Sequence, residues 1–210
     1  MTMQKGFIIS FEGGEGAGKT TQIVRLRDHL VKEGFDVVVV REPGGTVISE
    51  QIREVVLSSK NIGMAYTAEV LLFQAARAQV YRELVLPSLE AKKIVLMDRT
   101  RDSSVVYQGM VRKFGVDTIE ELNKISTKDT YPDLTFLLDV DPKLGVERQV
   151  QAGGANRFEM ENLAFHQEVR EAYLYLAKQN DHARWELVDA NQTLEAVEEV
   201  IWKKVAEIIV

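Results

Sequence analysis

The stretch FEGGEGAGKTTQ, from Phe11 to Gln22, decides the fold of this chain. Within it, Gly13-Gly14-Glu15-Gly16-Ala17-Gly18-Lys19-Thr20 matches the phosphate-loop pattern G-x-x-x-x-G-K-[ST]. The apolar run Phe7 to Phe11 precedes the pattern and helical spacing from Thr21 to Glu33 follows it, which is the context that the motif requires. Glycines let consecutive N–H groups turn toward a phosphate, and a helix N-terminus adds positive potential. The stretch therefore predicts a site for a nucleoside triphosphate.

The phosphate-loop pattern also predicts individual contacts with ATP. We expect Lys19 to reach the β and γ phosphates and the Thr20 hydroxyl to bind Mg²⁺. The fate of the γ phosphate stays open at this point, because switches, motors and small-molecule kinases share the loop. The string Asn123-Lys124-Ile125-Ser126 lacks the aspartate of a guanine-reading N-K-x-D, which disfavours a GTPase switch. The residues expected at ATP are Gly13, Gly14, Glu15, Gly16, Ala17, Gly18, Lys19, Thr20 and Thr21.

Four more apolar runs predict further strands, at Val37 to Val40, Ile94 to Met97, Leu134 to Leu138 and Trp185 to Val188. None alternates between polar and apolar residues, which is typical of parallel strands buried on both faces. Segments with helical spacing separate the runs, as from Ala68 to Leu86. Strand and helix in alternation predict a three-layer α/β sandwich with a parallel sheet.

Composition narrows the function classes. The 210 residues suggest one domain, and the absence of cysteine excludes a disulfide scaffold, a thiolate zinc site and a thiol nucleophile. A net charge of −6, from 26 Lys and Arg against 32 Asp and Glu, disfavours a protein that coats nucleic acid. No apolar run approaches the roughly 18 residues of a membrane span, and Met1 to Ser10 lacks a secretory signal. We expect a soluble cytoplasmic protein without nucleic-acid or membrane partners.

Charged residues follow the predicted strands, where ligands of open parallel sheets bind. Asp98 follows the third run and can hold Mg²⁺ through water, and Arg99 beside it has the fork geometry for a phosphate. A plain surface ion pair is the alternative for these two. Phe73 and Arg77 lie four apart on a predicted helix, so they can stack on a base and hydrogen-bond its edge. A core Phe73 with a solvated Arg77 is the alternative here.

The chain resembles the bacterial thymidylate kinases (dTMP kinases), a family of phosphate-loop nucleoside monophosphate kinases, along nearly its whole length. The resemblance implies the phosphate-loop kinase fold with five parallel strands in the order 2-3-1-4-5. It implies one domain over residues 1–210 with a short lid at about 145–160. The stretches that carry it are FEGGEGAGKTTQ (11–22), REPGGT (41–46), AEVLLFQAAR (68–77), DRTRDSSVVYQG (98–109), YPDLTFLLDV (131–140) and NRFE (156–159).

The family's activity follows as an expectation. The chain would phosphorylate dTMP to dTDP with ATP and Mg²⁺, a step of dTTP biosynthesis that supplies DNA synthesis. It would act as a homodimer that packs through the helix at about 68–86. A kinase of the same fold acting on another monophosphate, and a non-catalytic nucleotide-binding protein, stay open as alternatives.

The resemblance implies roles around dTMP. Phe73 would stack on the thymine ring, with Arg77, Ser104 and Gln108 around its polar edges. Arg53 and Arg99 would hold the acceptor phosphate. Glu15 would contact the 3′-hydroxyl and Tyr107 would crowd the 2′ position. A pocket for the 5-methyl group is worth about 1 to 3 kcal/mol, so selection over dUMP should be partial. The residues expected at dTMP are Glu15, Glu42, Arg53, Phe73, Arg77, Arg99, Ser104, Tyr107 and Gln108.

The expected lid departs from the family pattern, in which basic residues usually lie there. The glycine-containing stretch Gln149 to Asn156 predicts a mobile loop, and Val150 to Asn156 contains no arginine or lysine. Only Arg148 and Arg157 flank it, and we expect Arg148 to supply charge to the transition state. Structural ion pairs of both arginines are the alternative. The expected catalytic residues are thus Lys19, Asp98, Arg99 and Arg148, with Thr20 and Asp98 at the metal.

Overall fold

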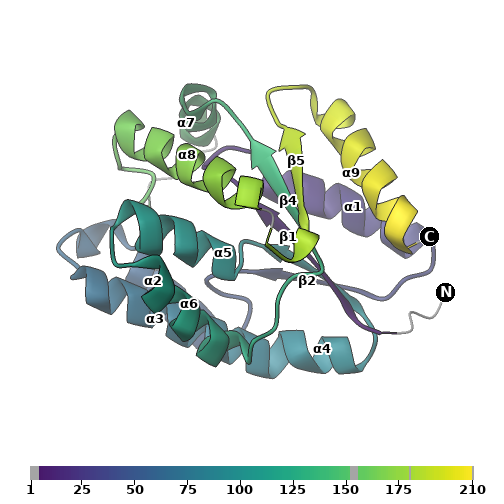
Figure 1. Ribbon diagram of the computed structural model, residues 1–210, viewed down its shortest axis with the longest axis horizontal. Coiled ribbons are helices and arrows are strands. Elements are labelled where there is room, and N and C mark those ends of the chain that lie inside the picture. Colours follow the sequence, from purple (N-terminus) through teal and green to yellow (C-terminus); the bar gives the residue numbers. More distant parts are fainter. Residues whose placement is uncertain (1–4, 152–155, 180, 210) are drawn as a thin grey trace.

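Five parallel strands form one sheet at the centre of the computed structural model, which describes residues 5–151, 156–179 and 181–209 (Figure 1). Their spatial order is β2-β3-β1-β4-β5, which confirms the predicted fold class and strand order. The bounds are β1 (Phe7–Glu12), β2 (Val37–Arg41), β3 (Ile94–Asp98), β4 (Leu134–Asp139) and β5 (Trp185–Asp189).

Each strand continues one residue beyond its predicted apolar run and includes the charged residue that follows. Asp98 pairs in register with Phe11 on one side and Arg41 on the other, and Asp139 pairs with Asp189. These charged residues therefore take part in the strand pairing, and the pairing fixes the backbone that carries their side chains.

The two edge strands are less buried than their sequences suggest. Val39 of β2 is 43% exposed and Leu187 of β5 is 58% exposed. The prediction of burial on both faces is thus wrong at the edges, because apolar runs of edge and central strands look alike. In β1 and in the apolar parts of β3 and β4, the three inner strands, every residue is buried.

Helices cover both faces of the sheet (Figure 1). On one face, α1 (Lys19–Lys32) and α9 (Leu194–Ile209) share a core with side chains of β1, β3 and β4. On the other face, one core forms around α8 and the strand residue Leu137, and a second around the end of α3 and the strand residue Val95. The remaining helices are α2 (Val47–Leu57), α3 (Tyr66–Val80), α4 (Leu86–Glu90), α5 (Arg101–Ser104), α6 (Val116–Thr127), α7 (Pro142–Gln151) and α8 (Leu163–Gln179).

Short helical turns complete the chain. The helix expected from Ala68 to Leu86 begins earlier, at Tyr66, and runs through a π-helical turn, Tyr81–Val85, into α4. A second π-helical segment, Val105–Val111, continues α5, and 3₁₀ turns lie at Ser59–Asn61 and Asp181–Ala183.

The predicted loop at 149–156 differs at its start, because residues 149–151 belong to α7. Residues 152–155 lie outside the described part of the chain. In the described ranges we find no helix with the length and apolar character that a membrane crossing requires.

Candidate active site

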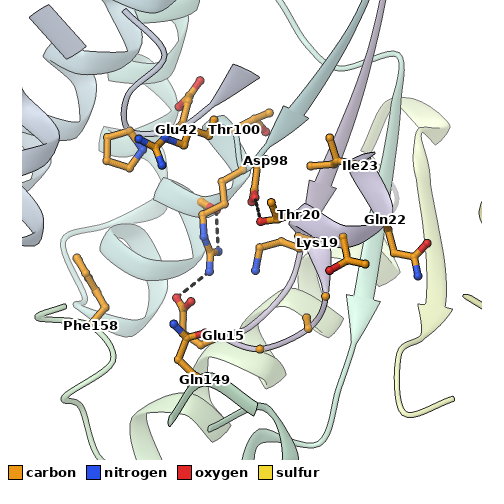
Figure 2. Close-up of a pocket in the computed structure, with 18 of the residues that line it drawn as sticks. Glu15, Lys19, Thr20, Gln22, Ile23, Glu42, Asp98, Thr100, Gln149 and Phe158 are labelled. Carbon is orange, nitrogen blue, oxygen red and sulfur yellow. Dashed lines mark hydrogen bonds and ion pairs between the residues drawn. The ribbon is translucent and has the colours of Figure 1, made fainter. Parts of the chain in front are cut away.

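A cavity of about 1040 Å³ lies at the carboxyl ends of the strands, between the phosphate loop and the segments that follow β2 and β3 (Figure 2). The structure brings nearly all the predicted site residues to this cavity. Gly13 and Gly14 line a small pocket behind the loop instead. The predicted residues that line the cavity are Glu15, Gly16, Ala17, Gly18, Lys19, Thr20, Thr21, Glu42, Arg53, Phe73, Arg77, Asp98, Arg99, Ser104, Tyr107, Gln108 and Arg148.

The phosphate loop needs glycine at two positions above all. Gly16 has φ +67°, and a Cβ there would lie 2.0 Å from the carbonyl oxygen of Gly145 on α7. Gly18 precedes α1 with φ +86°, and no described side chain caps that helix. The first N–H groups of α1 are thus left for an anion.

Two cations lie over the phosphate loop. Lys19 Nζ donates to the carbonyl oxygens of Gly14 (2.8 Å) and Gly13 (3.2 Å), and Arg99 Nη1 donates to Gly13 O at 3.1 Å. Burial lowers the pKa of Lys19, and the charge of Arg99 acts in the same direction. Phosphate oxygens would offer these cations stronger partners than neutral carbonyls do.

Glu15 of the phosphate loop forms an ion pair with Arg99. Arg99 Nη2 lies 2.8 Å from Glu15 Oε1, and the Tyr107 hydroxyl donates to the same oxygen at 3.3 Å. Burial opposes ionisation of Glu15, but the charges of Arg99 and Lys19 prevail and lower its pKa. The sequence alternative of an Asp98–Arg99 surface pair is therefore wrong, since Arg99 pairs with Glu15 and its side chain is only 15% exposed.

Thr20 and Asp98 lie side by side, as expected for the metal site (Figure 2). The Thr20 hydroxyl donates to Asp98 Oδ2 at 2.7 Å. A hydroxyl and a carboxylate are the oxygen ligands that Mg²⁺ prefers. The described residues contain no cluster of three or more acidic, histidine or cysteine side chains that could hold a metal by themselves. This pair thus fits a Mg²⁺ ion that takes its other ligands from phosphates and water.

Arg77 is a buried ion-pair partner. Its Nε donates to Glu42 Oε2 at 2.7 Å, and the two side chains are 1% and 3% exposed. The alternative of a solvated Arg77 is therefore wrong. Burial raises the pKa of Glu42, opposed by the charge of Arg77. Phe73 is half-buried on the same helix and lines the cavity, with its ring edge-on to Phe158 at 5.9 Å.

Arg53 reaches the cavity from α2 and donates from Nη1 to the carbonyl oxygen of Pro43 at 2.6 Å. Burial, and then the charge of Arg41, lower its pKa. Among the described residues, Pro43 O is the one acceptor bound by Arg53, and it takes only Nη1. The N–H groups of Nε and Nη2 can therefore donate to a phosphate.

The two arginines that flank the expected lid differ in their surroundings. Arg157 is buried, pairs with Glu69 at 2.7 Å and donates twice to Val56 O. Arg148 lines the cavity and donates to Ala190 O at 3.2 Å. The structural alternative therefore holds for Arg157, whereas the one partner of Arg148 within the described ranges is a neutral carbonyl.

A buried carboxylate below the cavity was not singled out from the sequence as a site residue. Glu12 accepts hydrogen bonds from the Thr100 backbone N–H (2.7 Å), the Ser103 hydroxyl (2.7 Å) and the Tyr173 hydroxyl (2.8 Å). Burial, and then the charge of Asp102, raise its pKa. Glu12 could have been found from the sequence, because it follows a predicted strand. Tyr173 lies in the middle of a helix, and no sequence pattern indicates its role.

The fold and the cavity together define a phosphate-loop nucleoside monophosphate kinase. One open space joins a triphosphate-binding loop to a second pocket lined by arginines and an aromatic ring. The family model described as "Thymidylate kinase" matches residues 11–201. The chain therefore belongs to the thymidylate kinase family, whose members are ATP-dependent transferases that phosphorylate dTMP to dTDP.

Similar proteins support this membership over almost the whole chain. It is 43% identical over 203 residues to a thymidylate kinase of Caldanaerobacter subterraneus subsp. tengcongensis, covering 97% of this chain and 96% of that protein. It is 44% identical over 195 residues to one of Geobacillus sp. (strain WCH70), covering 92% of each. The crystal structure of thymidylate kinase from Ehrlichia chaffeensis superposes with a TM-score of 0.79 at 31% identity, covering 95% of this chain and 98% of that one.

Proposed function

We propose that the cavity of this chain transfers the γ-phosphoryl group of ATP to the phosphate of dTMP, which yields ADP and dTDP. The observation that carries the proposal is the continuity of the cavity. The phosphate loop, Arg53 and Phe73 line one space, so a donor and an acceptor can meet there end to end. Phosphoryl transfer needs this in-line placement more than it needs covalent chemistry from the protein.

The base would lie between Phe73 and the polar wall formed by Arg77, Ser104 and Gln108. Ser104 already accepts from Arg77 Nη1 at 3.0 Å, which fixes the guanidinium in the wall. Tyr107 packs edge-on against Phe158. It would stand beside C2′ of the sugar and would leave no room for a ribose hydroxyl. Discrimination against ribonucleotides is then steric.

The charge that spreads over the transferring group would meet Lys19 and Arg99. Both now bond to loop carbonyls, and the acceptor and donor phosphates would take over these donors. Mg²⁺, held by Thr20 and Asp98, would supply further positive charge at the β and γ phosphates. Glu15, which is paired with Arg99, would keep that guanidinium directed into the cavity and would contact the 3′-hydroxyl of the sugar.

We assign residues 145–160 to the lid of a single domain and Arg148 to the additional transition-state charge. Its only hydrogen bond among the described residues is to Ala190 O, and such a bond is readily exchanged for a phosphate. Arg148→Ala should lower kcat more than tenfold. Arg157→Ala should act chiefly on stability, because that guanidinium is occupied by Glu69. A loss below tenfold in Arg148→Ala contradicts the assignment.

We also propose that the chain forms a homodimer that packs through α3. We further propose that the protein acts in the cytoplasm. Leu71 on the outer face of α3 is 55% exposed and Tyr66 at its start 51%, which leaves apolar surface for a second copy. Sedimentation equilibrium tests the dimer, and Leu71→Glu should shift it toward monomer. Cell fractionation tests the location.

An ADP-release assay with Mg²⁺ and ATP tests the activity across dTMP, dUMP, dGMP, dCMP and AMP. We expect dTMP to be the best acceptor, with dUMP second. A different best acceptor points to another monophosphate kinase, and ATP binding without turnover points to a non-catalytic nucleotide-binding protein. Either result contradicts the proposal.

A further inference from the structure

Gln108 presents its amide to the cavity in one fixed orientation. Its Nε2 donates to Oε1 of Glu69 at 2.8 Å, and Gln108 is 2% exposed. A carboxylate can only accept hydrogen bonds, so turning the amide by 180° would set two acceptor oxygens against each other. The Oε1 of Gln108 is thereby left as an acceptor that has no hydrogen-bond donor among the described residues.

Glu69 is itself held by a buried ion pair. It lies on α3 with its side chain fully buried, and Arg157 Nη1 lies 2.7 Å from its second oxygen. Arg157 is fixed in turn by two bonds to the carbonyl oxygen of Val56 at the end of α2. Val56 thus fixes Arg157, Arg157 fixes Glu69, and Glu69 orients the amide of Gln108.

Arg77 on α3 provides the complementary group in the lining of the same cavity. Its guanidinium carries five N–H groups. Partners occupy four of them: Glu42 takes Nε, Ser104 and Asn123 take Nη1, and the Thr100 carbonyl takes one hydrogen of Nη2. One Nη2 hydrogen has no acceptor in the part of the chain that the structure describes. The wall therefore offers a donor at Arg77 and, one turn beyond Ser104, an acceptor at Gln108.

We infer that Glu69 is a positioning residue that selects thymine over cytosine by fixing the amide of Gln108. Thymine presents a carbonyl at C4 and an N–H at N3, which match a donor followed by an acceptor. Cytosine presents an amino group and a bare ring nitrogen, which is the reverse pattern. The inference rests on the proposed function, because it takes the base to lie beside Gln108.

Glu69→Gln tests the inference, since a glutamine there can accept or donate and lets the Gln108 amide turn over. We expect kcat/KM for dTMP to fall, kcat/KM for dCMP to rise, and their ratio to drop about tenfold, the worth of one hydrogen bond. Calorimetric titration with dTMP and dCMP without ATP should give the same change in the ratio of Kd values.

Two further variants keep the test decisive. Glu69→Asp retains the charge beside Arg157 but shortens the reach to Gln108, so it should lower the ratio even if Glu69→Gln does not fold. Asp102→Asn breaks a similarly buried ion pair, with Arg184 at 2.7 Å, and leaves Gln108 untouched, so the ratio should stay as in the unmodified chain.

Each outcome has one meaning. A dTMP to dCMP ratio that is unchanged in folded Glu69→Gln and Glu69→Asp overturns the inference, as does an equal fall in Asp102→Asn. If the unmodified chain does not phosphorylate dTMP, the proposed function itself fails, and this is seen before any variant is made.

Discussion

Replacing Tyr173 by phenylalanine removes one oxygen atom from beneath the cavity. That oxygen donates to Glu12 Oε2 at 2.8 Å, lies 2.8 Å from Ser103 Oγ and accepts from Arg99 Nη1 at 3.1 Å. Tyr173 is 1% exposed, and a phenyl ring fills the same space. The substitution therefore tests the hydrogen bonds of the hydroxyl with little change in packing.

The magnitude follows from what remains after the change. A hydrogen bond to a charged group contributes about 1.5–3 kcal/mol. Glu12 keeps Thr100 and Ser103 as donors, and Arg99 keeps Glu15. Because neither charge is left without a partner, we expect the lower end, about 1.5–2 kcal/mol of the free energy of unfolding. Loosening of Arg99 should also lower kcat/KM for dTMP, by roughly threefold to tenfold.

Urea unfolding and steady-state ADP release measure the two effects. Tyr175→Phe is a matched control, since Tyr175 lies on the same helix and is 59% exposed. It should change stability by less than about 0.5 kcal/mol. A Tyr173→Phe protein that is indistinguishable from this control in both assays refutes the role of the buried network.

Three further predictions concern the phosphate loop, the buried Arg157–Glu69 ion pair and the pH dependence. Gly16→Ala should abolish measurable ATP binding by calorimetry, because its Cβ would lie 2.0 Å from Gly145 O; retained affinity contradicts the tight contact. Arg157→Met should cost about 3–5 kcal/mol in denaturant unfolding, because Glu69 loses its buried partner; a cost below about 1 kcal/mol speaks against it. Glu15 has a folded-state pKa below the unfolded 4.5, so the stability it contributes is present above pH 4.5 and is lost as pH falls through the folded value. Glu15→Gln should therefore lose less stability between pH 6 and 3 than the unmodified chain does, and equal losses argue against the ion pair.

The sequence predicts those parts of this molecule whose physics is local. The five strands and the phosphate loop follow from short runs whose composition and neighbours determine their conformation, and the structure confirms them. The expected positions of Phe73 and Arg77 on one helix are confirmed as well, because residues four apart share a face.

The sequence leaves open those features that depend on contacts between distant segments. A solvated Arg77 stays open as an alternative because its partner, Glu42, lies 35 residues earlier, directly after β2. Glu69 and Tyr173 carry no local signal, since a polar residue on a helix is ordinarily solvent-facing. Only the packing of α3 and α8 against the cavity shows that these two side chains face inward.

Gly16 and Gly145 meet without any intervening side chain, the backbone of the phosphate loop directly on the backbone of α7. Neither glycine has a side chain that could change its rotamer and so absorb a displacement. A shift of α7 by a fraction of an ångström must therefore displace the phosphate loop as well. The position of α7 and the binding of a donor nucleotide by the loop are thus mechanically coupled.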